Sequence, residues 1–224
     1  MQNGLQEQKF ETTYKANTGS GIYKFVKRAF DFIVALVAIV AISPLLLIIS
    51  AIVYLGDPGS VIYGQLRIGK NGKAFKMWKF RSMYKNADKM IDQLTDEQRQ
   101  QYITEFKIDN DPRITPVGNF LRKTSLDELP QLFNVLCNDM SLVGPRPLIE
   151  SEIQTYYADM FDTLLSAKPG VTGYWQAYAR NNATYQSGQR QQMEMYYVNH
   201  ASIMLDIKIL FRTVASVLRR DGAK

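Results

Sequence analysis

The chain has 224 residues, of which 46% are hydrophobic and 21% charged, which is sufficient for a folded core and excludes an intrinsically disordered chain. Its single cysteine, Cys137, and single histidine, His200, exclude a disulfide framework and argue against metal sites built from several such residues. Carboxylates are therefore the expected catalytic groups of any enzyme, and the net charge of +6 predicts an anionic partner: phosphate ligands, lipid headgroups or nucleic acid.

A long apolar segment follows a short polar N-terminus. Residues 1–22 are expected to be a flexible N-terminus. Residues 23–56 come next, and between Phe32 and Leu55 they carry no charge. A helix over this uncharged stretch would measure about 36 Å, longer than the ~30 Å hydrocarbon core of a bilayer. The segment is therefore predicted to enter a membrane.

The dipeptide Ser43–Pro44 lies in the middle of this segment. Proline removes a backbone donor and clashes with the carbonyl four residues earlier, so we expect a helix–break–helix here. Basic residues flank the segment on both sides, which favours a re-entrant hairpin that returns to the side it entered; the alternative is a kinked helix that spans the bilayer. Lys27 and Arg28 are expected as interfacial anchors, one of them paired with Asp31.

Residues 57–224 are predicted to fold as a domain outside the membrane segment. Residues 61–83 have the pattern of a strand, a turn and a second strand, and residues 84–107 that of polar helices broken near Thr95. The apolar period of residues 200–220 predicts an amphipathic helix, which either lies on the membrane surface or covers the core. The expected fold class is α+β: a mostly helical, membrane-associated domain with a small β-hairpin or sheet and interfacial helices.

Two adjacent carboxylates, Asp127 and Glu128, stand at the start of a helix predicted over residues 125–137. Ser125 is expected to cap this helix, with Glu128 completing a capping box. The free N–H groups and positive dipole end of a helix start stabilise anions, so one carboxylate could attack a substrate while the other holds a metal. The alternative is that both are ordinary first-turn acids.

Arg146 lies between Pro145 and Pro147 in a stiff turn. An arginine fixed in this way suits bidentate recognition of a phosphate group, and the alternative is an ordinary surface turn. Isolated cations elsewhere are more often surface residues than ligands. Weaker signals of this kind are Lys79, Arg81 and Arg113.

Several short motifs occur in a fixed order within and after residues 23–56. They are Lys27–Arg28 with Asp31, Ser43–Pro44, Gln65-x-Arg67-x-Gly69, Lys79–Met83, Asp111–Thr115, Leu121–Gln131, Asn134–Val135, Asp139–Pro147 and Lys168–Gly173. In this order and spacing the chain resembles the monotopic phosphoglycosyl transferases, also called bacterial sugar transferases, in their minimal short form. The resemblance covers residues 23–224.

The resemblance implies transfer of a sugar 1-phosphate from a UDP-sugar to polyprenyl (undecaprenyl) phosphate with release of UMP. This is the first membrane step of exopolysaccharide, capsule, O-antigen or glycoprotein glycan assembly. It implies that Asp127 attacks the sugar-bearing phosphate and carries a covalent phosphosugar, and that Glu128 binds Mg²⁺. The residues expected to bind substrate are Lys79, Arg81, Arg113, Arg122, Pro145, Arg146, Pro147 and Arg180.

The resemblance also implies a location and partners. Residues 57–224 would be a catalytic domain on the cytoplasmic face of the bacterial inner membrane, held there by a monotopic hairpin. Expected partners are membrane lipids and downstream glycosyltransferases, with a homodimer as an option and no nucleic acid. Asn138 replaces the glycine of a turn in relatives, and asparagine tolerates the left-handed conformation. The alternative function is a non-catalytic, basic, membrane-docked scaffold that binds lipid or nucleic acid.

Overall fold

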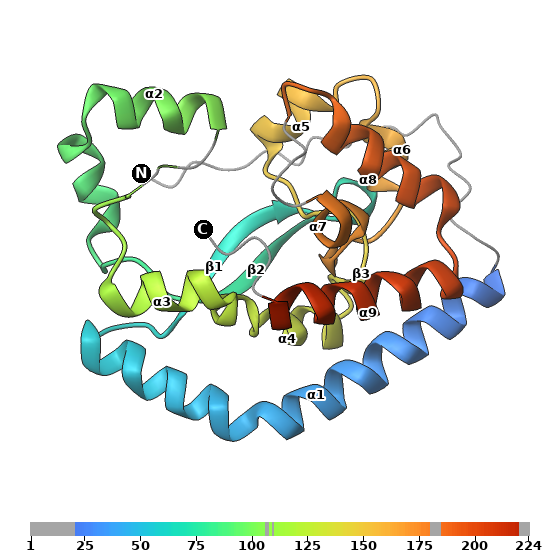
Figure 1. Ribbon diagram of the computed structural model, residues 1–224, viewed down its shortest axis with the longest axis horizontal. Coiled ribbons are helices and arrows are strands. Elements are labelled where there is room, and N and C mark those ends of the chain that lie inside the picture. Colours follow the sequence, from blue (N-terminus) through green and yellow to red (C-terminus); the bar gives the residue numbers. More distant parts are fainter. Residues whose placement is uncertain (1–20, 106–107, 109, 180–184, 220–224) are drawn as a thin grey trace. The chain divides into compact units, whose positions relative to one another are not determined.

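The computed structural model describes residues 21–105, 108, 110–179 and 185–219, which form mostly helices together with two small sheets (Figure 1). The chain divides into two compact units, each with its own hydrophobic core. The first unit comprises the described residues within 21–40, 65–77 and 131–219, and the second comprises those within 41–64 and 78–130. The predicted α+β class is confirmed.

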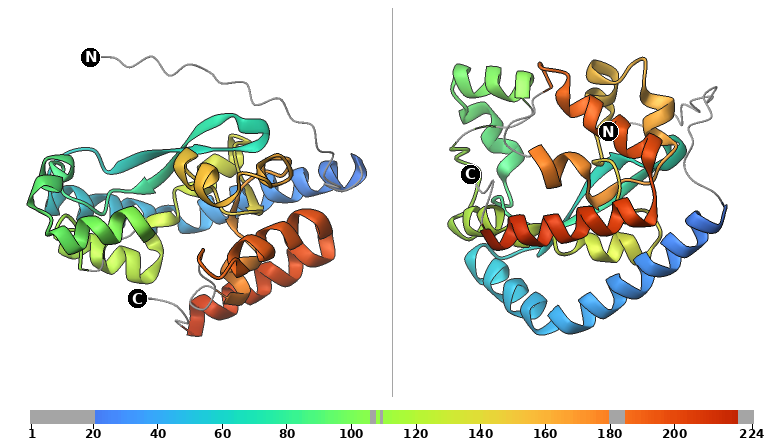
Figure 2. Two further views of the ribbon diagram at one scale, coloured as in Figure 1. Left: turned by 90° about the horizontal axis from the view of Figure 1, so that it is seen from above. Right: turned by 45° about the vertical axis from the view of Figure 1, so that its right-hand side comes forward.

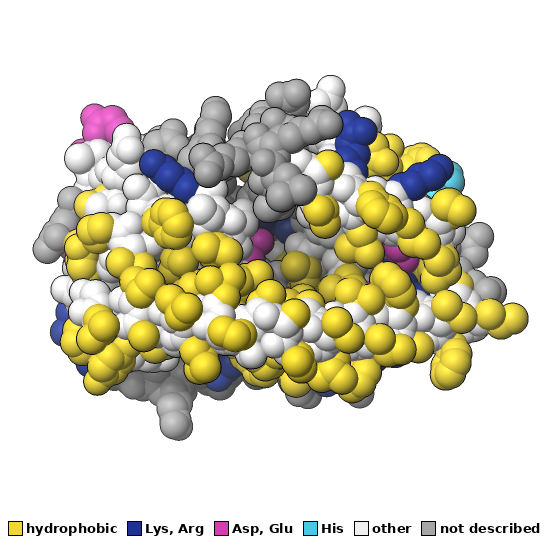
Figure 3. Space-filling view, turned by 60° about the horizontal axis from the view of Figure 1, so that its bottom comes forward, with side chains coloured by type: hydrophobic (Ala, Val, Ile, Leu, Met, Phe, Trp, Pro, Cys, Tyr) yellow, Lys and Arg dark blue, Asp and Glu magenta, His cyan; other side chains and the backbone are white. Residues whose placement is uncertain are grey.

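Helix α1 (Gly21–Gly56) contains the apolar segment. Pro44 lies in its interior, and helical structure continues through Ser43–Pro44. Proline removes one backbone donor from the helical ladder at this point, and the kink or break expected there, like the re-entrant course, stays a prediction. The helix is long and apolar enough to cross a membrane and is mostly exposed. Figure 3 shows hydrophobic side chains gathered along it.

A β-hairpin follows α1, as predicted for residues 61–83. Strands β1 (Ile62–Ile68) and β2 (Ala74–Phe80) pair as a two-stranded sheet, seen as a long ribbon in Figure 2. A 3₁₀ turn, η1 (Lys70–Gly72), lies in the connection. The N–H of Gly69 donates to the carbonyl of Lys73 at 2.8 Å, which closes the hairpin.

The first unit is built around a short parallel pair of strands. Ser141 lies opposite Gly170, and Val143 lies opposite Thr172. A methyl group on Gly170 would overlap the backbone of Gly144, so glycine permits this close approach. The elements of the unit after the hairpin are α4 (Gln131–Leu136), β3 (Ser141–Val143), α5 (Glu150–Tyr156), α6 (Phe161–Leu165), β4 (Gly170–Thr172), α7 (Tyr174–Ala179), α8 (Gln189–His200) and α9 (Ile203–Arg219).

Side chains from several helices fill the core of the first unit. Val135 of α4, Val198 of α8 and Ile209 of α9 are fully buried. The opposite face of α9 leaves Met204 and Phe211 exposed. Helix α9 therefore covers the core, as one of the two predicted alternatives states, and it also presents an apolar face outward.

The second unit packs the C-terminal half of α1 against the helix that precedes the two candidate carboxylates. Ile49 and Val53 of α1 form its core with Phe80 and Leu121. Burial of these apolar side chains is the main favourable term that holds the unit together. Its elements besides α1 and the hairpin ends are η2 (Ala87–Gln93), α2 (Asp96–Glu105), α3 (Pro116–Thr124) and η3 (Leu126–Glu128).

The polar stretch 84–107 is interrupted at Thr95, as predicted. The N–H of Gln98 donates to Thr95 Oγ1 at 3.2 Å, and the N–H of Thr95 donates to Gln98 Oε1 at 3.1 Å. This reciprocal pair is a capping box, and α2 begins immediately after it.

The chain over residues 125–137 differs from the single capped helix predicted. Ser125 adopts a left-handed conformation (φ 56°, ψ 17°) that ends α3, and its side chain makes no cap bond to η3. Pro130 lacks the N–H that a continuous helix would need at its position, so the helix restarts at Gln131 as α4. Asn138 has a φ of 69°, which confirms the left-handed turn expected there.

Candidate active site

Asp127 lies on the 3₁₀ turn η3 of the second unit, and only 7% of its surface is exposed. The left-handed Ser125 turns the chain out of α3 immediately before it. Its neighbours Leu126 and Leu129 pack against the core of the unit. These apolar contacts fix the turn, so the Asp127 carboxylate has a defined position and little surrounding water.

Burial raises the pKa of Asp127 to about 6 from its ordinary value of 3.8. The positive charge of Lys79 opposes this rise most strongly, the negative charge of Glu128 adds to it, and Arg122 opposes it. A carboxylate with this pKa is mostly ionised at neutral pH but poorly solvated. Such a group is suited to attack an electrophile, because desolvation leaves its negative charge available.

Glu128 follows on the same turn and pairs with Lys79 of β2. The Lys79 Nζ donates to Glu128 Oε1 at 2.9 Å, and the side chains are 23% and 34% exposed. Ion pairs that are partly exposed contribute little stability. Lys79 can therefore exchange this partner for another anion at small cost.

Arg122 lies in the last turn of α3 and is held by the side chain of Ser82. Its Nε donates to the hydroxyl of Ser82 at 2.8 Å. The Ser82 carbonyl in turn accepts the N–H of Thr115 at 3.0 Å. Ser82 thereby connects the start of α3, the cation at its end and the residues after β2. It lies in the motif Lys79–Met83, but no role of its own was predicted for it from the sequence.

Two of the predicted substrate-binding arginines already have carboxylate partners. Arg113 donates its Nε and Nη2 to the two oxygens of Asp111, at 2.8 and 2.7 Å. Arg81 lies 3.5 Å from the Asp57 carboxylate, measured from Nη1 to Oδ2, and also donates to the Asp57 carbonyl. The geometry thus brings Lys79 and Arg122 to Asp127, while Arg81 and Arg113 are held by other acids.

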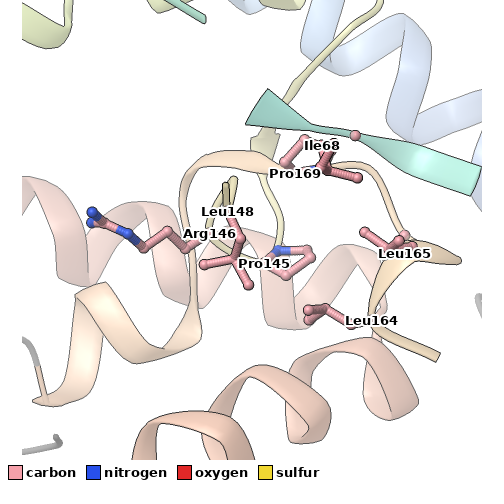
Figure 4. Close-up of a pocket in the computed structure, with 9 residues that line it drawn as sticks. Ile68, Pro145, Arg146, Leu148, Leu164, Leu165 and Pro169 are labelled. Carbon is pink, nitrogen blue, oxygen red and sulfur yellow. The ribbon is translucent and has the colours of Figure 1, made fainter. Parts of the chain in front are cut away.

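The Pro145–Arg146–Pro147 turn belongs to the first unit, between β3 and α5. The N–H of Arg146 donates to both oxygens of Glu194, at 3.2 and 3.3 Å. The carbonyl of Pro147 accepts from Arg67 Nη1 at 3.3 Å. Figure 4 shows the Arg146 side chain extending away from the apolar residues around the turn. Hydrogen bonds thus fix the backbone of the turn at Arg146 and at Pro147, while the Arg146 guanidinium extends away from the apolar residues.

The predicted interfacial anchors make contacts inside the first unit. Asp31 is 4% exposed and accepts from the hydroxyl of Ser141 at 2.7 Å. Burial raises the pKa of Asp31, and the positive charge of Lys27 opposes this rise, so the two groups interact as expected. Lys27 also pairs with Asp206 at 2.8 Å. Arg28 donates to the carbonyls of Val135 and Leu136 at the end of α4.

Arg180 lies outside the described residues.

Within the part of the chain that the structure describes, no group of three or more His, Cys, Asp or Glu side chains could hold a metal. The partly exposed Glu128 has a carboxylate that could serve as a ligand of a metal at the candidate site. Glu194 and Arg190 were not predicted from the sequence, because they lie in a Gln-rich helix, α8, without a recognisable motif.

Residues 22–220 match the family model described as bacterial sugar transferase. The chain belongs to this family. It is 46% identical over 203 residues to the undecaprenyl-phosphate galactose phosphotransferase of Salmonella typhimurium. The aligned residues make up 89% of this chain and 42% of that protein. It is 41% identical over 201 residues to the UDP-glucose:undecaprenyl-phosphate glucose-1-phosphate transferase of Escherichia coli, with 87% and 40% covered.

A further relative in the bacterial sugar transferase family has a similar length. The exopolysaccharide production protein ExoY of Sinorhizobium fredii is 40% identical over 200 residues, which are 88% of this chain and 87% of that protein. The chain thus spans less than half of the Salmonella and Escherichia relatives but most of ExoY. The predicted family is confirmed.

Proposed function

We propose that this chain transfers a sugar 1-phosphate from a UDP-sugar to polyprenyl phosphate and releases UMP. The observation that carries the proposal is Asp127, a buried carboxylate on a fixed turn with a pKa of about 6 and with Lys79 and Arg122 acting on its charge. The printed names of two relatives support the substrate class. Both include undecaprenyl phosphate, and one includes UDP-glucose and glucose 1-phosphate.

The reaction proceeds as two displacements at one phosphorus atom. A carboxylate oxygen of Asp127 attacks the phosphorus that bears the sugar, and the bond between the two phosphates of the donor breaks. UMP leaves with the electron pair, and a phosphosugar ester of Asp127 remains. An oxygen of polyprenyl phosphate then attacks the same phosphorus, the bond to Asp127 breaks, and the carboxylate is regenerated.

Negative charge must be stabilised on the phosphoryl oxygens in both displacements. Lys79 and Arg122 supply positive charge beside Asp127, and Lys79 pairs with the partly exposed Glu128. Mg²⁺ usually takes one or two carboxylates together with phosphate oxygens and water, and the partly exposed Glu128 fits that donor set. When bound, the ion would polarise the phosphate groups of the donor.

The lipid acceptor requires a site close to a membrane, and α1 supplies the means of reaching one. We place the protein on the cytoplasmic face of the bacterial inner membrane, as a monotopic protein whose α1 enters one leaflet. Basic residues before and after α1 favour this arrangement, because cations are retained on the cytoplasmic side. Glycosyltransferases that extend the lipid-linked sugar would act next.

The proposal is tested by measuring UMP release from a panel of UDP-sugars, with the full chain in membranes, Mg²⁺ and polyprenyl phosphate. At least one donor should release UMP, Asp127→Asn should abolish release, and Glu128→Gln should lose most of it. Mass spectrometry with donor but without acceptor should find a phosphosugar on Asp127. Activity that withstands EDTA would remove the magnesium assignment.

The alternative is a non-catalytic, membrane-docked scaffold. It predicts no UMP release from any donor and unchanged lipid binding in the Asp127→Asn variant. Turnover that survives this substitution would overturn the role given to Asp127.

A further inference from the structure

A cluster of buried arginines in the first unit has several N–H groups that donate to no acceptor among the described residues. Arg67 and Arg190 are 8% and 9% exposed, and the charge of Arg146 acts on both. An unpaired buried donor is unfavourable, so several in one place point to a site built for an acceptor. Five such nitrogens, without a hydrogen bond among the described residues, are Arg67 Nε, Arg146 Nε, Trp175 Nε1, Arg190 Nε and Arg190 Nη2.

Arg190 is clamped by two aromatic rings. Its guanidinium carbon lies 4.0 Å from the centroid of the Trp175 ring and 3.9 Å from that of Tyr185. The rings hold the guanidinium in place and leave the N–H groups along its edges available to bind a ligand. Nε and Nη2 form one edge, and two parallel N–H groups on one edge match two oxygens of a phosphate.

Arg146 lies close to the same aromatic ring. Its guanidinium carbon is 5.8 Å from the Trp175 centroid. The turn that carries Arg146 is fixed by the backbone hydrogen bonds to Glu194 and Arg67 described above. Two guanidinium groups with free donors therefore border one ring.

The buried carboxylates of this cluster are already engaged. Glu152 accepts from Arg67 at 3.1 Å, from the N–H of Ile149 at 3.0 Å and from the Tyr185 hydroxyl at 3.0 Å. Glu194 accepts the N–H of Arg146, and burial raises the pKa of Glu194 to about 7. Three guanidinium groups thus face two carboxylates, which leaves the cluster with net positive charge.

We propose that Arg190 and Arg146 together bind a phosphate group, with Trp175 and Tyr185 holding Arg190 in position. The proposal rests on the proposed function, which supplies two sources of that group: the nucleotide of the donor and the headgroup of the lipid acceptor. The competing explanation is that Arg190 is a stacked cation that only fills the core.

The test measures equilibrium binding to the full chain in nanodiscs, with inorganic phosphate, UMP and a short-chain polyprenyl phosphate as separate ligands. Arg190→Gln should weaken binding of at least one of them tenfold or more, and the affected ligand identifies the source. Arg190→Lys should keep the charge but lose most of the affinity, because lysine lacks the two-donor edge. Arg212→Gln is the matched control, since Arg212 also stacks on a tyrosine, 4.3 Å from the Tyr178 centroid, and donates to a backbone carbonyl.

Melting temperatures of all three variants show which are folded, and Arg190→Lys keeps the proposal testable if Arg190→Gln does not fold. Unchanged affinity of a folded Arg190 variant for all three ligands would overturn the proposal. UMP release from the same preparations separates the two proposals. If the wild-type chain releases UMP but Arg190 has no effect on binding or KM, this inference fails alone. If phosphate binding depends on Arg190 and no donor yields UMP, the proposed function fails alone.

Discussion

Asp127 combines burial with a short, irregular backbone turn, and this combination sets its chemistry. A carboxylate at a regular helix start would be stabilised by free N–H groups, which lower a pKa. On η3 the larger influence is desolvation, and the nearby cations offset only part of it. At the scale of single residues, the chemistry of the site therefore depends on the limited access of water to the Asp127 carboxylate.

The pH dependence of activity should report the ionisation of Asp127. Because the attacking form is the carboxylate, UMP release should fall as the pH drops through about 6. Lys79→Gln should move this acidic limb to higher pH, since Lys79 is the group that most lowers the pKa of Asp127. Lys76→Gln, also in β2 and exposed, is the control and should leave the limb in place. If UMP release by the wild-type protein declines only below pH 5, the raised pKa of the buried Asp127 is contradicted.

The stability of the fold should rise when Asp127 loses its charge. The pKa of this group is higher in the folded chain, about 6, than its ordinary 3.8, so ionisation above pH 6 disfavours the folded state and protonation below pH 4 removes that effect. Asp127→Asn should therefore raise the free energy of unfolding at pH 7.5 by up to about 3 kcal/mol, with little change at pH 4. Thermal melts at both pH values measure this. The exposed Asp159→Asn serves as the control, and an equal gain at both pH values would rule out the explanation.

At the scale of elements, the close approach of α3 to the chain after β2 fixes the candidate site. Thr115 caps α3 by accepting the N–H of Gly118 at 2.8 Å, and Pro116 occupies the first helical position. Gly118 then lies directly against the backbone of Ser82. This contact positions the Ser82 hydroxyl, which holds Arg122.

Gly118→Ala should disrupt this contact. The added methyl group would overlap the Ser82 carbonyl oxygen, which is backbone and cannot rotate away. We expect a loss of about 3 kcal/mol in the free energy of unfolding, together with reduced UMP release. Asn119→Ala, at the exposed neighbouring position, should change stability by less than about 0.5 kcal/mol. Equal melting temperatures for the two variants would show that the helix can shift without consequence.

For the molecule as a whole, the central question is how α1 meets the bilayer. Its N-terminal half is tied into the first unit through Lys27, Arg28 and Asp31, which bond to residues more than 100 positions later in the chain. The side chains along its outer face are apolar and exposed. An exposed apolar surface of this kind is unfavourable in water, so lipid is the expected contact of this face of α1.

Cysteine labelling in intact cells distinguishes the two courses of α1. In a Cys137→Ser background, an impermeant maleimide should fail to label Asn3→Cys if α1 returns to the cytoplasmic side. Lys89→Cys, on the exposed surface of η2, should also be protected, and both should react after lysis. Labelling of Asn3→Cys from outside would show that α1 spans the membrane.

The sequence predicted much of the fold where the pattern is local. The hairpin of residues 61–83, the interruption at Thr95 and the left-handed Asn138 were predicted from turn and capping chemistry, which depends on neighbouring residues. The capping role of Ser125 was predicted by the same rules and was wrong, because Ser125 adopts the left-handed conformation that ends α3. The break or kink at Pro44 stays a prediction.

By itself, the sequence determined that the chain has a long apolar segment, an α+β fold and the motifs of the bacterial sugar transferases, because periodicity, composition and motif order are properties of the linear chain. Only the tertiary structure decided which charges act together. It placed Lys79 and Arg122 beside Asp127, gave Arg81 and Arg113 to other acids, and gathered Arg67, Arg146 and Arg190 around shared rings and carboxylates. The physical reason is that desolvation and electrostatic pairing depend on distances between residues far apart in sequence.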